Sequence, residues 1–179
     1  VPTSADWMRA VTDKEFIEVF SHTIFSSFVA TATAIVFGFI FAYGVNYTNM
    51  PCKRFFQVVA LLPTMAPSVV SGLAFIMLFG RRGFITWEML HLKVDLYGPV
   101  GLWAAQTIAF FPLAYITISG VLKNISPNLE LAAQNLGAKG WYLFRTVTLR
   151  LATPGLASAF LLVGINSLAD FGNPMLVGG

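Results

Sequence analysis

Charged residues are scarce in this chain of 179 residues, and those present lie mainly at the ends of long apolar runs. Only 11% of the residues are charged and 56% are hydrophobic, whereas a soluble domain carries about 25% charged residues. This scarcity excludes an ordinary soluble domain. The net charge of +3 forms no basic stripe interleaved with polar recognition residues, so the sequence predicts no nucleic-acid partner.

Cysteine and histidine are equally rare, and this limits the chemistry that the chain can perform. A single cysteine, Cys52, excludes an internal disulfide, and the two histidines, His22 and His91, lie far apart. No group of histidines, cysteines and carboxylates has the spacing of a metal site. The nucleotide-binding pattern G-x-x-x-x-G-K-[ST] is also missing, so no metal or cofactor is predicted for this chain itself.

Four apolar runs are long enough to cross a membrane, whose core of about 30 Å needs about 20 helical residues. They cover residues 24–44, 55–79, 98–122 and 152–168. The predicted fold class is therefore all-α, a polytopic membrane helix bundle, with residues 24–179 forming the transmembrane domain. Residues 1–23 are predicted to form an amphipathic, extracytoplasmic segment. Within it, residues 6–20 suit a place on the membrane surface and the end of a longer helix or domain equally well.

Prolines and polar residues near these runs are candidates for a translocation pathway. Pro63 and Pro67 lie within the second run, where each lacks an N–H and frees a carbonyl that needs a partner in neighbouring helices or water. This favours either a place beside a pathway or a simple packing kink. Asp170 and Asn173 follow the fourth run; an interfacial position suits Asp170, and residues 171–174 are predicted to form a turn.

The segment between the third and fourth runs, residues 124–150, has a helical pattern of its own. Ser126 is a favourable N-cap, Pro127 suits the first helical position, and Gly137 suits a left-handed helix end. A second amphipathic segment then places Trp141 and Phe144 on one face. Such a unit either docks into a groove of a partner or lies on the lipid surface, and the pattern alone slightly favours the second.

The positive charges do not orient the bundle. Six lysines and arginines flank this segment and the turn before the second run, whereas five lie on the opposite side, so the positive-inside rule gives no clear answer. The six are Lys53, Arg54, Lys123, Lys139, Arg145 and Arg150; the five are Arg9, Lys14, Arg81, Arg82 and Lys93.

Residues 124–150 resemble the EAA loop of binding-protein-dependent ABC importer permeases. That motif reads E-A-A, three residues, glycine, nine residues, then I-x-L-P. The chain has Ala132-Ala133, three residues, Gly137, nine residues, then residues 147–149 as V-T-L. Leu131 occupies the position of the motif glutamate, and Glu130 lies one residue earlier. This departure bears on any ion pair made by the motif glutamate, but it leaves the helix–glycine–helix shape intact.

The resemblance extends over nearly the whole chain after residue 18. Within the EAA-like loop, Arg150 replaces the final proline of the motif, and Pro154 lies four residues later. Residues 22–23 are similar to the Asn-Thr entry of the family, and residues 61–83 to its proline-containing second core helix. The stretch SLADFGNPMLVGG, residues 167–179, resembles ferric-iron importer permeases, which often join two permease halves in one chain. Because the chain begins at Val1 without an initiator methionine and ends without a polar tail, we interpret it as a fragment of a longer protein.

The resemblance implies a permease of an ATP-driven importer in the bacterial inner membrane. Its expected partners are a pair of ATPase subunits that bind ATP, a second permease half, fused or separate, an extracytoplasmic substrate-binding protein, and membrane lipid. The expected cargo is ferric iron, with aminoethylphosphonate, thiosulfate or a polyamine as alternatives. The implied ATPase-coupling residues are Glu130, Leu131, Ala132, Ala133, Gly137 and Ala138.

Two other classes are less consistent with the residues. An intramembrane enzyme would use Ser71, which precedes Gly72, but no G-x-S pattern and no nearby base accompany it. A secondary transporter needs charged residues within its spans for ion coupling, and the four runs lack them. The chain is therefore predicted to be a transport subunit and not an enzyme.

Overall fold

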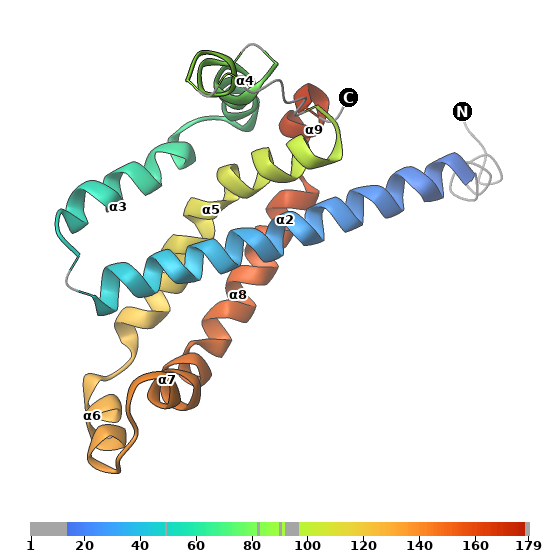
Figure 1. Cartoon of the computed structure of the whole chain (residues 1–179). Coiled ribbons are helices and arrows are strands. Elements are labelled where there is room, and N and C mark those ends of the chain that lie inside the picture. The colour runs from blue at the N-terminus through green and yellow to red at the C-terminus, as the bar shows by residue number, and fades with distance from the viewer. Residues whose placement is uncertain (1–13, 49, 82, 90, 92–96, 178–179) are drawn as a thin grey trace.

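The structure, a computed structural model, describes residues 14–48, 50–81, 83–89, 91 and 97–177. Every regular element within these residues is a helix, which confirms the all-α prediction. Four helices are long and apolar enough to cross a membrane, as the polytopic prediction requires. Figure 1 shows them as an open bundle, with a small helical unit projecting at one end.

Three long helices form the centre of the bundle: α2 (Lys14–Tyr47), α5 (Pro99–Asn124) and α8 (Leu149–Leu168), each in contact with the other two. Lipid supplies little hydrophobic drive for association between helices, so close packing of small residues stabilises such bundles. The main buried cluster follows this rule, since six of its ten residues are alanines. Its members are Ala34, Ala42, Ala60, Ala114, Tyr115, Ile118, Leu122, Ala152, Ala159 and Val163.

The first long helix is longer than the predicted run of residues 24–44. It begins at Lys14 and passes without interruption across the boundary that we placed after residue 23. Residues 14–37 contain no glycine or proline, so nothing in the sequence ends the helix there. The extracytoplasmic segment predicted over residues 1–23 therefore overlaps α2, and its residues 1–13 lie outside the described residues.

The second predicted run, residues 55–79, is interrupted, so the single helix expected there is wrong. It consists of α3 (Lys53–Leu61), a 3-10 turn η1 (Leu62–Met65) and α4 (Ser68–Phe79). The break lies at the two prolines, because a residue before proline is driven out of the helical region. Ala66, which precedes Pro67, is accordingly extended at φ −98° and ψ 136°. In Figure 1, α3 and α4 lie well apart.

A candidate span over residues 69–89 instead joins α4 to η2 (Phe84–Met89), a π-helical turn. The third predicted run matches α5 closely. The fourth, residues 152–168, corresponds to α8, which continues upstream through η3 (Phe144–Thr148), another π-helical turn, into α7 (Gly140–Leu143). The fourth candidate span accordingly covers Gly140–Leu168.

A short helix, α9 (Gly172–Val177), replaces the turn predicted over residues 171–174, which is therefore wrong. Proline is tolerated in the first turn of a helix, so Pro174 does not prevent it. The helix packs against α4 and α5. Gly72 makes the contact with α4 close, since a Cβ there would lie 3.0 Å from Leu176 Cδ1 and 3.1 Å from Asn173 Oδ1.

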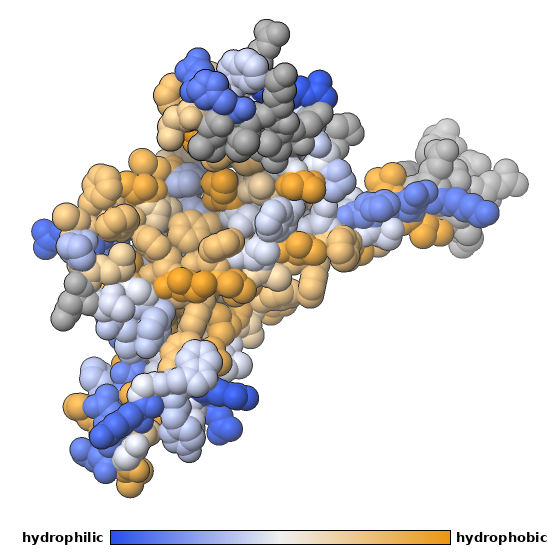
Figure 2. Space-filling model, viewed as in Figure 1, coloured by the Kyte–Doolittle hydropathy of each residue, from blue (hydrophilic) through white to orange (hydrophobic). Residues whose placement is uncertain are grey.

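The surface of the bundle is divided into bands. Figure 2 shows apolar residues across the middle of the molecule and hydrophilic residues at its two ends. Large apolar side chains are exposed along the central helices, including Phe37 and Ile40 on α2 and Leu161 and Ile165 on α8. Such a continuous apolar surface is unsuited to water and is typical of a surface that faces lipid.

Candidate functional site

The unit that projects from the bundle is built from α6 (Pro127–Asn135), the turn that follows it, and α7 with η3. Ser126 has the extended backbone of an N-cap, although its side chain makes no capping hydrogen bond, and Pro127 is the first helical residue. We call residues 126–148 the coupling loop. The predicted sequence of helix, glycine turn and second helical segment is present in this loop.

Gly137 ends α6 in the left-handed conformation, with φ +92°. The Ala138 N–H donates to the Ala133 carbonyl at 3.0 Å, and the Gly137 N–H donates to the Gln134 carbonyl at 2.9 Å. These two bonds form a Schellman motif, which satisfies carbonyls that would otherwise be unpaired at the helix end. The chain then reverses into α7, so the glycine sets the shape of the tip.

The tip of the coupling loop is apolar and accessible. Leu136 is 90% exposed and Leu131 is 55% exposed, and Ala132 and Gly137 are exposed beside them. Ala133 and Ala138 are half-buried. Isolated exposed leucines are common, but here they cluster on small residues that permit close approach of another surface. The arrangement suits insertion into a groove of a partner.

Glu130 differs from the other predicted coupling residues, because its carboxylate is directed into the protein. It is half-buried, and the Thr148 hydroxyl donates to Glu130 Oε1 at 2.9 Å. The Tyr47 phenol, at the end of α2, interacts with the same carboxylate. Sequence analysis identified Glu130 but missed Tyr47, because no local pattern signals a partner 83 residues away. An additional contact of Glu130 with an ATPase remains a prediction.

An aromatic cluster joins the same two parts of the molecule. The ring of Phe144 in η3 lies 5.1 Å from that of Tyr43 and 6.0 Å from that of Phe39, both in α2. Trp141 stacks on Phe144 at 5.1 Å, and Tyr43 stacks on Tyr47 at 4.9 Å. The base of the coupling loop is therefore attached to α2 by both apolar and polar contacts.

A second group of polar side chains lies at the opposite end of α5 and α8, around Asp170. Its carboxylate accepts from Gln106 Nε2 at 3.3 Å and from Asn173 Nδ2 at 2.8 Å. Gln106 and Asn173 are buried, and the Ser167 hydroxyl donates to Gln106 Oε1 at 3.4 Å. Asp170 thus fixes the junction of α8 and α9. Whether Asp170 and Asn173 also line a pathway stays a prediction.

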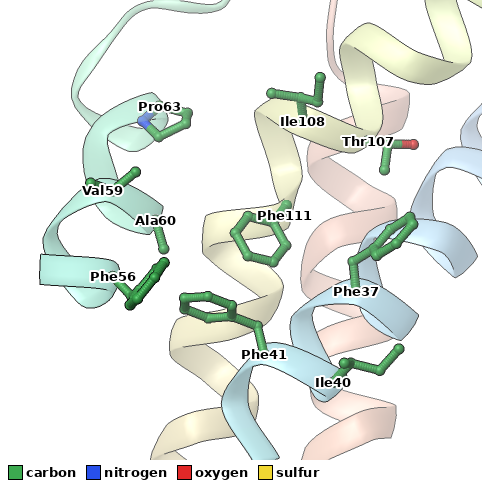
Figure 3. A pocket seen from close by; sticks show the side chains of 10 residues that line it. All are labelled: Phe37, Ile40, Phe41, Phe56, Val59, Ala60, Pro63, Thr107, Ile108 and Phe111. Atoms are coloured by element: carbon green, nitrogen blue, oxygen red, sulfur yellow. The ribbon is translucent and has the colours of Figure 1, made fainter. Parts of the chain in front are cut away.

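Pro63 lies elsewhere, in the wall of a cavity of about 500 Å³ between α2, α3 and α5. Figure 3 shows that the labelled side chains around this cavity are apolar except for Thr107. The Thr107 hydroxyl already donates to the Trp103 carbonyl at 2.7 Å. An ion gains little in such an apolar site. Pro67 is exposed at the start of α4, so the structure does not gather the four predicted pathway residues into one site.

Metal-binding groups are not assembled either: within the described ranges, no three histidines, cysteines or carboxylates come together in a way that could hold a metal ion. The fold and the loop together define a multi-pass helical membrane domain with a projecting helical unit.

The chain belongs to the family described as binding-protein-dependent transport system inner membrane component, whose family model matches residues 34–179. It is 35% identical to a ferric transport system permease protein of Actinobacillus pleuropneumoniae, covering 96% of this chain and 26% of that relative. It is 33% identical to a molybdenum transport system permease protein of Escherichia coli, covering 90% of this chain and 71% of the relative.

A sulfate transport system permease protein of Escherichia coli is 29% identical, with 98% of this chain and 64% of the relative covered. These findings confirm the resemblance drawn from the spacing of the coupling loop. The chain spans about a quarter of the ferric relative and a larger part of the other two.

Proposed function

We propose that this chain forms part of the permease of an ATP-driven importer in the bacterial inner membrane, and that its coupling loop docks on a separate ATPase subunit. The observation that carries the proposal is the accessible apolar tip, with Leu131, Ala132 and Leu136 exposed beyond the bundle. A short helix with this exposure suits a groove on a partner. ATP is bound and hydrolysed by that partner.

The continuous helix behind the tip supplies a route for movement. The segments α7, η3 and α8 form one helical stretch from Gly140 to Leu168, so a force on the loop acts directly on a membrane-spanning helix. Rigid-body displacement of packed helices is a common way to switch between two states. In the complete importer, two such loops and two permease halves would alternate the pathway between outward and inward openings.

The proposed cargo is ferric iron, delivered by an extracytoplasmic binding protein. The support is the ferric relative, at 35% identity across 96% of this chain, together with residues 167–179. Relatives named for sulfate and molybdenum match this chain at comparable identity. The membrane helices therefore support the class of transporter more strongly than the cargo, and aminoethylphosphonate, thiosulfate and polyamines remain alternatives.

Docking is tested by co-purifying the full-length protein with its candidate ATPase. We expect Ala132→Asp and Leu136→Asp each to weaken binding about tenfold or more, because an unpaired carboxylate in an apolar groove loses its hydration. Pro51→Asp is the matched control, since Pro51 is exposed in the turn between α2 and α3, outside the coupling loop. Equal binding by all variants, or none by the wild type, would refute the docking proposal.

Cargo is tested with the same complex in proteoliposomes, supplied with binding protein loaded with radiolabelled ferric iron. We expect ATP-dependent accumulation of iron that unlabelled sulfate or molybdate does not reduce. Accumulation of another cargo in place of iron would show that the cargo is wrong while the permease assignment holds.

A further inference from the structure

We propose that Glu130 is a positioning residue that ties the coupling loop to α2, so that docking at the tip moves α2 and α8 together. This inference rests on the proposed function, because it assigns the route by which movement leaves the docking site. It differs from the expectation that Glu130 contacts the ATPase directly.

The contacts of Glu130 join three parts of the chain that are distant in sequence. Glu130 lies in the first turn of α6, Thr148 ends η3 at the start of α8, and Tyr47 ends α2. Thr148 is buried, and its hydroxyl donates to Glu130 Oε1 at 2.9 Å. The Tyr47 phenol interacts with the same carboxylate. One side chain therefore holds the loop to two of the three central helices.

The chemistry of a carboxylate suits this task. An ionised carboxylate accepts several hydrogen bonds, and bonds to a charged acceptor are stronger than those between neutral groups. Partial burial reduces competition from water, so each bond contributes more than it would on the surface. A glutamine of the same size loses the charge and offers a single acceptor oxygen, which weakens the interactions with Thr148 and Tyr47 without removing packing.

The aromatic cluster around Phe144 makes the attachment firm but does not replace the tether. Its rings join η3 to α2, whereas α6, which carries Leu131 and Ala132 of the exposed tip, contacts η3 and α7. Glu130 lies in α6 and interacts with Tyr47 in α2. Loss of its bonds should leave the loop attached at η3 but allow α6 to move independently of α2.

This division predicts that docking and transmission separate. Substitutions at Glu130, Tyr47 and Thr148 leave the exposed tip unchanged, so the ATPase should still bind. The stimulation of ATP hydrolysis by the loaded binding protein requires that the two faces of the membrane communicate, and this stimulation should fall. A residue whose role is only to fold the loop would reduce binding and stimulation in parallel.

The test uses the full-length permease in proteoliposomes with its ATPase and iron-loaded binding protein. Glu130→Gln, Tyr47→Phe and Thr148→Val are compared with Ser158→Ala and Thr153→Val, whose parent side chains are exposed and lie outside the coupling loop. Thr153 bonds only within its own helix, to the Leu149 carbonyl at 3.0 Å. Two quantities are measured for each variant: the dissociation constant of the ATPase and the stimulation of ATP hydrolysis.

We expect the dissociation constant to change less than about threefold and the stimulation to fall about fivefold or more in the three tether variants, within the usual range of coupling between sites. The double variant Tyr47→Phe/Glu130→Gln should be no worse than Glu130→Gln alone, because residues in one network are not additive. The two control variants should behave as the wild type.

Several results would overturn the tether. Weaker ATPase binding by Glu130→Gln alone would show a direct contact, and unchanged stimulation in all three variants would show that nothing is transmitted there. Parallel loss of binding and stimulation would assign a purely structural role. Failure of the wild type to bind any ATPase would instead refute the proposed function itself, and the binding measurement distinguishes this case from the others.

Discussion

At the residue scale, the conformation of the coupling loop depends on a few residues whose backbone conformation is determined locally. Gly137 has φ +92°, and a Cβ built on it would meet no other atom within 4 Å. The requirement for glycine is therefore conformational and not steric. Side chains other than those of glycine and asparagine rarely adopt the left-handed region, at a cost of about 1–2 kcal/mol.

This reasoning predicts different effects for two substitutions at Gly137. Gly137→Asn should bind the ATPase with nearly wild-type affinity, because asparagine tolerates the left-handed conformation. Gly137→Val should weaken binding about tenfold, since β-branched residues are especially unfavourable at positive φ. Isothermal titration of the ATPase into each detergent-solubilised permease variant measures the two affinities. Equal affinities would show that the Schellman turn does not determine the docking geometry.

The sequence was sufficient to predict where α6 begins and ends, at Ser126, Pro127 and Gly137, because helix ends depend on residues within one helical turn. It was not sufficient for the tether, because Tyr47 and Glu130 meet only once α2 and α6 are placed in space. The polar cluster at Asp170 is a similar case, because the bond from Gln106 to Asp170 spans 64 residues and no local pattern signals it.

At the element scale, the central helices approach closely because small residues lie where they cross. A Cβ at Gly38 in α2 would lie 2.8 Å from Ala114 Cβ and 3.0 Å from the Tyr115 backbone nitrogen in α5. Backbone atoms cannot move aside as a flexible side chain can. The helices would have to separate, with loss of packing along the buried alanines that they share.

Gly38→Ala should therefore destabilise the bundle by about 1–3 kcal/mol, the usual range for an overpacked core. Gly120→Ala is the matched control, because Gly120 likewise lies inside a long helix, α5, but no atom lies within 4 Å of its Cβ position. It should be neutral or more stable by up to about 1 kcal/mol, since alanine favours a helix interior. The unfolding midpoint of the purified protein in detergent separates them, and equal midpoints would contradict this account.

The presence and approximate position of the long helices followed from the lengths of the apolar runs in the sequence. Two details of the fold did not. The prolines were recognised as breaks in the helical hydrogen-bond pattern, yet the extent of the interruption between α3 and α4 depends on the backbone at Ala66. The residues of α9 include glycine, asparagine and proline, which suggest a turn. They form a helix because Asp170 Oδ1 accepts the Asn173 N–H at 3.4 Å and α4 and α5 pack against them.

At the scale of the whole molecule, the arrangement of helices establishes which loops share a face of the membrane. The contact between Tyr47 and Glu130 places the end of α2 beside the coupling loop. Cys52 follows five residues later, at the start of α3. The turn between α2 and α3 therefore lies on the same side of the membrane as the coupling loop. The turn η2, which precedes α5, lies on the opposite side. The nearly even distribution of positive charges could not establish this arrangement.

If the coupling loop docks on an ATPase, that shared side is the cytoplasm, and Cys52 is a native reporter of it. Cys52 is exposed and free, so a membrane-impermeant maleimide should label it in inside-out vesicles stripped of ATPase but not in right-side-out vesicles. A second variant carries Glu88→Cys together with Cys52→Ser, in full-length protein lacking other cysteines. It should show the opposite labelling pattern, because Glu88 is exposed on η2. Labelling of Cys52 from the outside would place the coupling loop on the extracytoplasmic side, where it could not bind an ATPase in the cytoplasm. The proposed importer mechanism would then be wrong.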